Sequence, residues 1–221
     1  MSSLVISARV TGLLPAIQLP LVWSCDDSQG PRPGTAILNV VNGSAEVDEA
    51  RAELDGQVIA LTCYPCSSGL TIDGGRYNLR LSAAADPSVE VTTSIFIDGG
   101  EEYHAILTGP ATALSLFLVR NDNDSDGGSG TERFHVIHAA PDLGPVDVYF
   151  TAFGVPLESV NPAKSGLSFK QTWYAPVSET EIEVRVTSQG SKISLTDGAF
   201  TDGGRTFILF GPPDFIFTLL L

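Results

Sequence analysis

The chain has 221 residues, which is long enough for one large domain or two small ones with a core each. Its formal net charge of −14 and sequence pI near 4.4 give a surface that repels phosphate backbones and anionic headgroups, which argues against nucleic-acid binding. A content of 22 glycines and 14 prolines, with 43% hydrophobic residues, is typical of short strands joined by turns and argues against long helices.

The N-terminal residues 1–24 predict a signal segment. An apolar run over 13–23 is too short to span a bilayer as a helix, and it ends at a serine followed by Cys25. This resembles a bacterial lipoprotein signal, in which a small residue precedes a cysteine that is lipidated and becomes the new N-terminus. The resemblance implies a lipid anchor on Cys25 and a tether over 25–34. The alternative is a first β-strand that packs on a domain or is donated to a neighbouring molecule.

Two further cysteines, Cys63 and Cys66, form a C-x-x-C motif in the sequence TCYPCSS. Such a motif can be a redox dithiol, half of a zinc site or a small disulfide. The chain has no second C-x-x-C, no flanking histidine and no thioredoxin-like βαβ context, which argues against the first two. In an oxidising compartment the pair is expected to close on itself as a structural disulfide.

The chain contains an internal duplication. The segment that starts at Asn39 aligns with the segment that starts at His135, at an offset of 96, and SIFIDGG from Ser94 aligns with GAFTDGG from Gly198, at an offset of 104. The second copy therefore carries about eight extra residues, which we place within 152–166. Two tandem repeats follow, over residues 35–120 and 132–221.

Each repeat has the pattern of an all-β domain. Val146, Val148 and Phe150 alternate with Asp147 and Tyr149, which is the period of a strand. Asp-Gly and Gly-Gly pairs at 55–56, 73–75, 98–100 and 202–204 are turn signals. Six or seven short strands in about ninety residues predict an immunoglobulin-like antiparallel β-sandwich. The predicted fold is therefore all-β, with two such sandwiches in tandem.

The acidic, Gly-rich linker at 121–131 is a candidate calcium site. Asp122, Asp124 and Asp126 precede Gly127 in a D-x-D-x-D-G pattern, and alternating carboxylates before a tight turn supply the oxygen ligands that Ca²⁺ prefers. An EF-hand would need glutamate at its twelfth position, where this chain has arginine, and Glu132 falls one residue short. A solvated linker without a metal is the alternative.

Two histidines lie in the sequence FHVIHAAPDLGPVDVYF, where the strand turns into a loop. His135 and His138 are three residues apart on an extended segment, so their side chains are expected to point to opposite faces rather than to hold one metal. Asp142 can bond the loop backbone in an Asx-type turn after Pro141. We predict a structural corner rather than an active site, since no G-x-S-x-G elbow accompanies it.

An adjacent aromatic pair, Trp173 and Tyr174, follows in the sequence KQTWYAPVSE. Such a pair can form an exposed ligand-binding patch. Aromatic residues at the start of a strand more often cover a sandwich core, which is the interpretation we prefer.

The second repeat resembles a known family. FHVIHAAPDLGPVDVYF is similar to the opening of the domain-of-unknown-function 4397 family, and DGGRTFILFGP resembles its Gly-anchored penultimate strand. The resemblance extends over nearly all of 35–221 as two copies, although residues 42–46 depart from the His-Ala-x-Pro-Asp pattern in the first. It implies bacterial, extracytoplasmic, often lipid-anchored β-sandwich proteins, and no established activity.

Together these features predict a non-enzymatic protein of the bacterial cell envelope or cell surface. Its expected role is binding or scaffolding, with a membrane anchor at Cys25 and a protein or glycan as surface partner. The alternative is a self-associating subunit of an extracellular filament or surface layer, whose apolar N-terminal segment completes a neighbour's sheet. An enzyme that uses the His138 region is a third, weaker alternative.

Overall fold

The strands begin and end close to the predicted turn signals. The computed structural model describes residues 30–121, 132–177, 182–200, 206–211 and 217–220. The strands of the first repeat are β1 (Thr35–Asn42), β2 (Glu49–Leu54), β3 (Gln57–Cys63), β4 (Cys66–Asp73), β5 (Gly75–Ala83), β6 (Glu90–Ile97), β7 (Glu102–Thr108) and β8 (Ser115–Asn121). Those of the second are β9 (Glu132–His138), β10 (Val146–Thr151), β11 (Lys164–Leu167), β12 (Thr172–Val177), β13 (Ile182–Ser188), β14 (Ser194–Phe200), β15 (Thr206–Phe210) and β16 (Phe217–Leu220).

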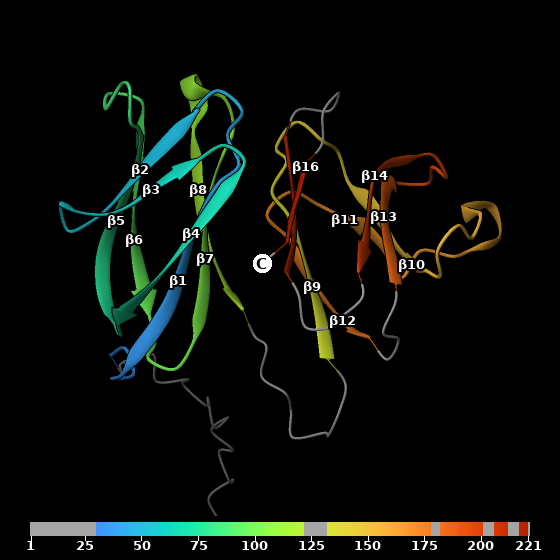
Figure 1. Cartoon of the computed structure of the whole chain (residues 1–221), viewed down its shortest axis with the longest axis horizontal. Coiled ribbons are helices and arrows are strands. Elements are labelled where there is room, and N and C mark those ends of the chain that lie inside the picture. The colour runs from blue at the N-terminus through green and yellow to red at the C-terminus, as the bar shows by residue number, and fades with distance from the viewer. Residues whose placement is uncertain (1–29, 122–131, 178–181, 201–205, 212–216, 221) are drawn as a thin grey trace, which may run out of the picture. The chain divides into compact units, whose positions relative to one another are not determined.

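Each repeat folds into a sandwich of two four-stranded sheets (Figure 1). In the first repeat the strand orders are β4-β1-β7-β8 and β3-β2-β5-β6, and in the second they are β12-β9-β15-β16 and β11-β10-β13-β14. The two sets of orders correspond strand for strand, so the duplication seen in the sequence is also a duplication of topology. The predicted all-β fold with two tandem sandwiches is confirmed.

Two details differ from the expectation. Among the described residues each sandwich has eight strands rather than six or seven. The pairing is antiparallel except at β1–β7 and β9–β15, where the first strand of each repeat pairs in parallel with the seventh. The parallel pairs lie at the centre of their sheets, with antiparallel neighbours on both sides.

Turns and loops account for the different lengths of the two repeats. β2 and β3 are joined by Asp55 and Gly56 alone, both with positive φ (47° and 82°), as a two-residue hairpin turn requires. The equivalent strands β10 and β11 are joined by residues 152–163, which include the 3-10 helix η2 (Leu157–Ser159). The extra residues of the second repeat therefore lie where the alignment places them. A second short 3-10 helix, η1 (Ala111–Ala113), precedes β8.

Three apolar layers hold residues 31–221 together as one compact unit. One layer fills the first sandwich and another fills the second. The third layer, which we call the inter-sandwich layer, joins the outer faces of the β1 and β9 sheets and consists of Val41, Ile106, Val119, Ile137, Ala139, Ile208 and Phe210. The central strands are therefore apolar on both faces, as strands buried on both sides are.

Candidate functional site

The polar end of the inter-sandwich layer is built around His104 on β7. The Nδ2 amide of Asn39 lies 3.4 Å from Nδ1 of His104 and donates to Oε1 of Glu102 at 2.7 Å. On its other side Nε2 of His104 lies 3.4 Å from Oγ1 of Thr206, a residue of the second sandwich. Since an amide nitrogen only donates, Nδ1 is the acceptor and the ring is the neutral Nε2–H tautomer. His104 is fully buried.

The second sandwich contributes a stacked pair of rings to the same end. His135 is 2% exposed, and its ring lies 6.3 Å from the ring of His104. It stacks on Tyr174 with a centroid distance of 4.0 Å and an interplanar angle of 13°. The hydroxyl of Tyr174 donates to the carbonyl oxygen of Arg120 at 2.9 Å, across to the first sandwich. Tyr174 thus belongs to the contact between the repeats, while Trp173 packs on the second core.

His138 ties together the two ends of the loop that follows β9. The backbone N–H of Ala140 donates to its Nδ1 at 3.3 Å, so the ring is neutral and Nε2 donates to the carbonyl oxygen of Gly144 at 3.2 Å. Burial lowers the pKa of His138 below its ordinary value of 6.5, although the hydrogen bond to Gly144 acts in the opposite direction. These contacts hold the loop backbone and leave no face of the ring exposed.

Asn42 has the same role in the first repeat, 96 positions earlier. Its Oδ1 accepts from the backbone N–H of Ser44 at 3.2 Å, and its Nδ2 donates to the carbonyl oxygen of Val47 at 2.7 Å. The amide therefore supplies one acceptor and one donor in the places where His138 supplies Nδ1 and Nε2. The loss of histidine in the first copy is explained by this substitution of one neutral donor–acceptor group for another.

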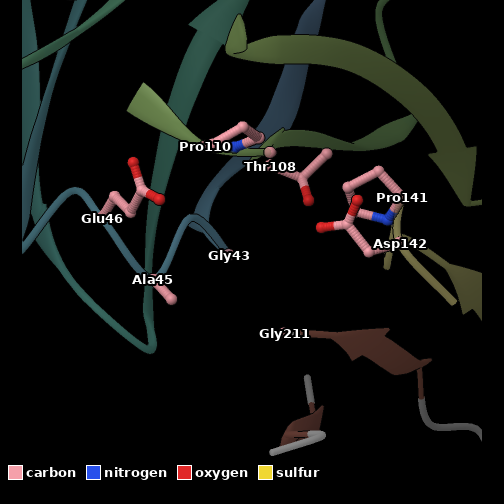
Figure 2. A pocket seen from close by; sticks show the side chains of 9 residues that line it. Gly43, Ala45, Glu46, Thr108, Pro110, Pro141, Asp142 and Gly211 are labelled. Atoms are coloured by element: carbon pink, nitrogen blue, oxygen red, sulfur yellow. The ribbon is translucent and has the colours of Figure 1, made fainter. Parts of the chain in front are cut away.

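The two corners meet at a pocket of about 140 Å³ (Figure 2). It is lined by residues of both repeats: Gly43, Ala45, Glu46, Thr108, Gly109, Pro110, Pro141, Asp142 and Gly211. Figure 2 shows Pro141 and Asp142 beside Thr108, with Glu46 on the far side of Pro110. Glu46 accepts from the backbone N–H of Ala111 at 2.9 Å, and Asp142 is exposed. The pocket is therefore small, and Glu46 and Asp142 are the carboxylates among the residues that line it.

Cys63 and Cys66 form a disulfide, as predicted. The bridge closes the turn by which the chain passes from β3 in one sheet to β4 in the other. Tyr64, within the turn, packs edge-on against Phe210 of the second sandwich with ring centroids 6.2 Å apart. The disulfide turn thus contributes a side chain to the inter-sandwich layer.

Replacing both Cys63 and Cys66 with serine is expected to lower the free energy of unfolding by about 2 kcal/mol or less, because a loop with two intervening residues restricts the unfolded chain little. Urea unfolding followed by circular dichroism measures the difference. A loss above about 4 kcal/mol would show that the bridge does more than close its own turn.

Asp147 is a structural residue that the strand pattern does not reveal. Alternation along β10 implies that Asp147 and Tyr149 face solvent, yet they are 3% and 1% exposed. The Asp147 carboxylate accepts from Ser165 Oγ at 2.7 Å, from Gly166 N at 2.9 Å and from Gly190 N at 2.8 Å. Burial by itself raises the pKa of Asp147, but these hydrogen bonds and the charge of Lys192 lower it overall.

Several predicted residues fall outside the part of the chain that the structure describes. These are Cys25, Asp122, Asp124, Asp126 and the side chain of Glu132. The lipid anchor and the calcium site therefore stay predictions. Over the described residues, no three histidine, cysteine, aspartate or glutamate side chains lie close enough together to hold a metal ion. In the same residues no helix has the length and apolar character needed to cross a membrane.

Two solved structures show weak similarity to the chain. The Bacillus anthracis TIE protein is 12% identical, with 81% of this chain and 34% of that chain covered and a TM-score of 0.26. CBMbc, of family CBM26, from Eubacterium rectale Amy13K in complex with maltoheptaose is 14% identical, with 85% and 96% covered and a TM-score of 0.25. The chain spans about a third of the TIE protein, and neither likeness bears on function. No curated protein matches the chain.

A family model matches residues 54–149 and is described as a domain of unknown function (DUF4397). The match begins at the last residue of β2 and ends within β10, the equivalent strand of the second repeat. Its length equals the repeat offset of 96, so it covers one full period of the duplication and straddles the two sandwiches. The chain is thus similar to the DUF4397 family over one repeat length.

Proposed function

We propose that this chain is a non-enzymatic, extracytoplasmic binding or scaffolding protein of a bacterial cell envelope. A lipid on Cys25 attaches it to the membrane, and the two docked sandwiches present a protein- or glycan-binding surface at a set spacing. The observation that carries the proposal is the inter-sandwich layer, because two domains docked through a buried apolar layer keep one relative orientation.

Two further observations support it. All three histidines of the chain are buried, at 0%, 2% and 0% exposure for His104, His135 and His138, and their ring contacts are structural. No histidine lines the pocket between the corners, and Glu46, one of the two carboxylates that line it, accepts a hydrogen bond from the backbone N–H of Ala111. The Cys63–Cys66 disulfide is typical of an oxidising, extracytoplasmic compartment.

The scaffold role predicts that the inter-sandwich layer sets the distance between the repeats. Ile208→Asp places a charge in that layer and is expected to broaden the pair-distance distribution in small-angle X-ray scattering, while the circular dichroism spectrum stays that of folded β-sheet. Ile193→Asp is the matched control, because Ile193 is 77% exposed. An unchanged distribution in Ile208→Asp would contradict the proposal.

The anchor is tested separately in a bacterial host that is fed an alkyne fatty acid. The full chain is expected to take up the label and to fractionate with membranes, and Cys25→Ser is expected to lose both properties. Size-exclusion chromatography with and without residues 1–30 tests the filament alternative. If the chain takes up no fatty-acid label and forms assemblies that are lost when residues 1–30 are removed, a structural subunit is favoured over an anchored lipoprotein.

A further inference from the structure

His104 occupies a place in which an added proton has no acceptor. Its Nε2–H already points to Thr206 Oγ1, and its Nδ1 already faces the donating amide of Asn39. The amide orientation of Asn39 is fixed on its other side, because Nδ2 donates to the Glu102 carboxylate at 2.7 Å. Protonation at Nδ1 would therefore set an N–H against an N–H₂ group and break the contact.

The groups around His104 come from both sandwiches. They are Asn39 on β1, Glu102 on β7, Val119 and Asn121 on β8, His135 on β9, Thr206 on β15 and, behind His135, Tyr174 on β12. Among these described side chains Glu102, His135 and Tyr174 carry ionisable groups. Glu102 would attract a protonated His104, but its two oxygens already accept from Asn39 and Asn121, at 2.7 Å and 3.0 Å.

The surroundings offer two responses to acid. Either a whole sandwich unfolds, or the sandwiches separate and let water reach His104. Separation leaves each sandwich with its own core and all of its strand pairing, and exposes the inter-sandwich layer with the polar groups at its end, including His104. It is the smaller change, since far less apolar surface becomes exposed.

We infer that His104 makes the contact between the two sandwiches pH-dependent, so that the contact is closed at neutral pH and opens as the solution is acidified. The opened state exposes the apolar outer faces of the β1 and β9 sheets as a new surface. The inference concerns the contact itself and holds whether or not the chain is anchored at Cys25.

The direction of the effect follows from linkage. Burial is the largest influence on the pKa of His104 and lowers it from the ordinary value of 6.5, against the charge of Glu102, which raises it. Below about pH 6.5 His104 therefore binds a proton in the opened state, whereas in the closed state it stays neutral until a lower pH is reached. The contact between the sandwiches has its full stability above pH 6.5 and loses stability as the pH falls from 6.5 towards the lower pKa of His104 in the closed state. The opening constant is expected to rise about five- to tenfold between pH 7.5 and 5.5.

Two neighbouring positions on β1 provide a matched pair of reporters. Val41 belongs to the inter-sandwich layer and Val40 to the core of the first sandwich, and both are fully buried. Val41→Cys and Val40→Cys are made in full-length protein that carries Cys25→Ser, with the Cys63–Cys66 disulfide intact. Each is labelled with a thiol reagent that stays reactive in acid, and the rates are corrected with free cysteine.

The Val41→Cys rate is expected to rise five- to tenfold from pH 7.5 to 5.5, while the Val40→Cys rate changes less than twofold. Adding His104→Gln, which cannot titrate, is expected to reduce the Val41→Cys response to less than twofold. If His104→Gln does not fold, His104→Thr takes its place, since threonine is the residue at the equivalent position 206. The inference would be overturned if both reporters accelerate equally or if neither does. It would also be overturned if the Val41→Cys response persists in the folded His104 variant.

Discussion

Asp147→Ala is expected to lower the free energy of unfolding by about 3–4 kcal/mol, because three donors lose a buried, charged acceptor at once. The donors come from β11 and from the turn after β13, so the carboxylate holds two segments against β10. Urea unfolding followed by the fluorescence of Trp173 measures the change, since Trp173 stacks on Phe150 at the core of the same sandwich.

Two variants make this prediction specific. Asp147→Asn keeps Oδ1 for Ser165 and Gly166 but turns an amide toward Gly190 N, so about half of the loss is expected. Asp142→Ala, at an exposed carboxylate, is expected to stay within about 0.5 kcal/mol of the wild type. Equal stability of Asp147→Ala and Asp142→Ala would show that the three hydrogen bonds contribute nothing net.

The Asp147 contribution also has a defined pH range. Its pKa is lowered in the folded protein, so its stabilisation is complete above the ordinary value of 3.8 and is lost as the pH falls below that value. In Asp147→Ala this part of the acid sensitivity is expected to disappear, which thermal unfolding at pH 5 and pH 3 can measure.

His138→Ala is expected to cost about 2–4 kcal/mol, whereas His138→Asn is expected to cost less than about 1 kcal/mol. Alanine leaves the backbone N–H of Ala140 and the carbonyl of Gly144 without their partner, and it also leaves a cavity. Asparagine restores one acceptor and one donor, as Asn42 does in the first repeat. Urea unfolding of the two variants side by side is the measurement, and equal losses would contradict the proposed equivalence of the corners.

The pH dependence of the two His138 variants provides an independent check. Because burial lowers the pKa of His138, its stabilisation is complete above pH 6.5 and falls below it, by up to about 1.4 kcal/mol per pH unit. The difference in stability between wild type and His138→Asn is therefore expected to shrink or reverse from pH 7.5 to 5.5. His104 is unchanged in both proteins, so its contribution cancels in the difference.

Local patterns predicted the elements of this fold well. The offset of 96 predicted the duplication, and the Asp55-Gly56 pair predicted a two-residue hairpin turn. The C-x-x-C spacing predicted the disulfide. Each of these features depends on residues that are close together in the sequence, and for that reason sequence alone was sufficient.

The features that were missed depend on contacts between distant segments. Alternation along β10 cannot show that β11 and the turn after β13 donate hydrogen bonds to Asp147. Likewise no local motif marks His104, because its partners on β1 and β15 are 65 and 102 positions away. One signal was available: the uninterrupted apolar run Phe207–Phe210 is typical of a strand buried on both faces, and so of a second packing partner.

The shared layer also bears on how the duplication can change over generations. A gene that kept only one repeat would encode a sandwich whose outer β1 or β9 sheet face is apolar, for example at Val41 and Ile106 or at Ile208 and Phe210. Such a face has to be covered by another protein surface or it promotes aggregation. Loss of either copy is therefore harmful unless the remaining copy pairs with itself, and the two halves are expected to be inherited together.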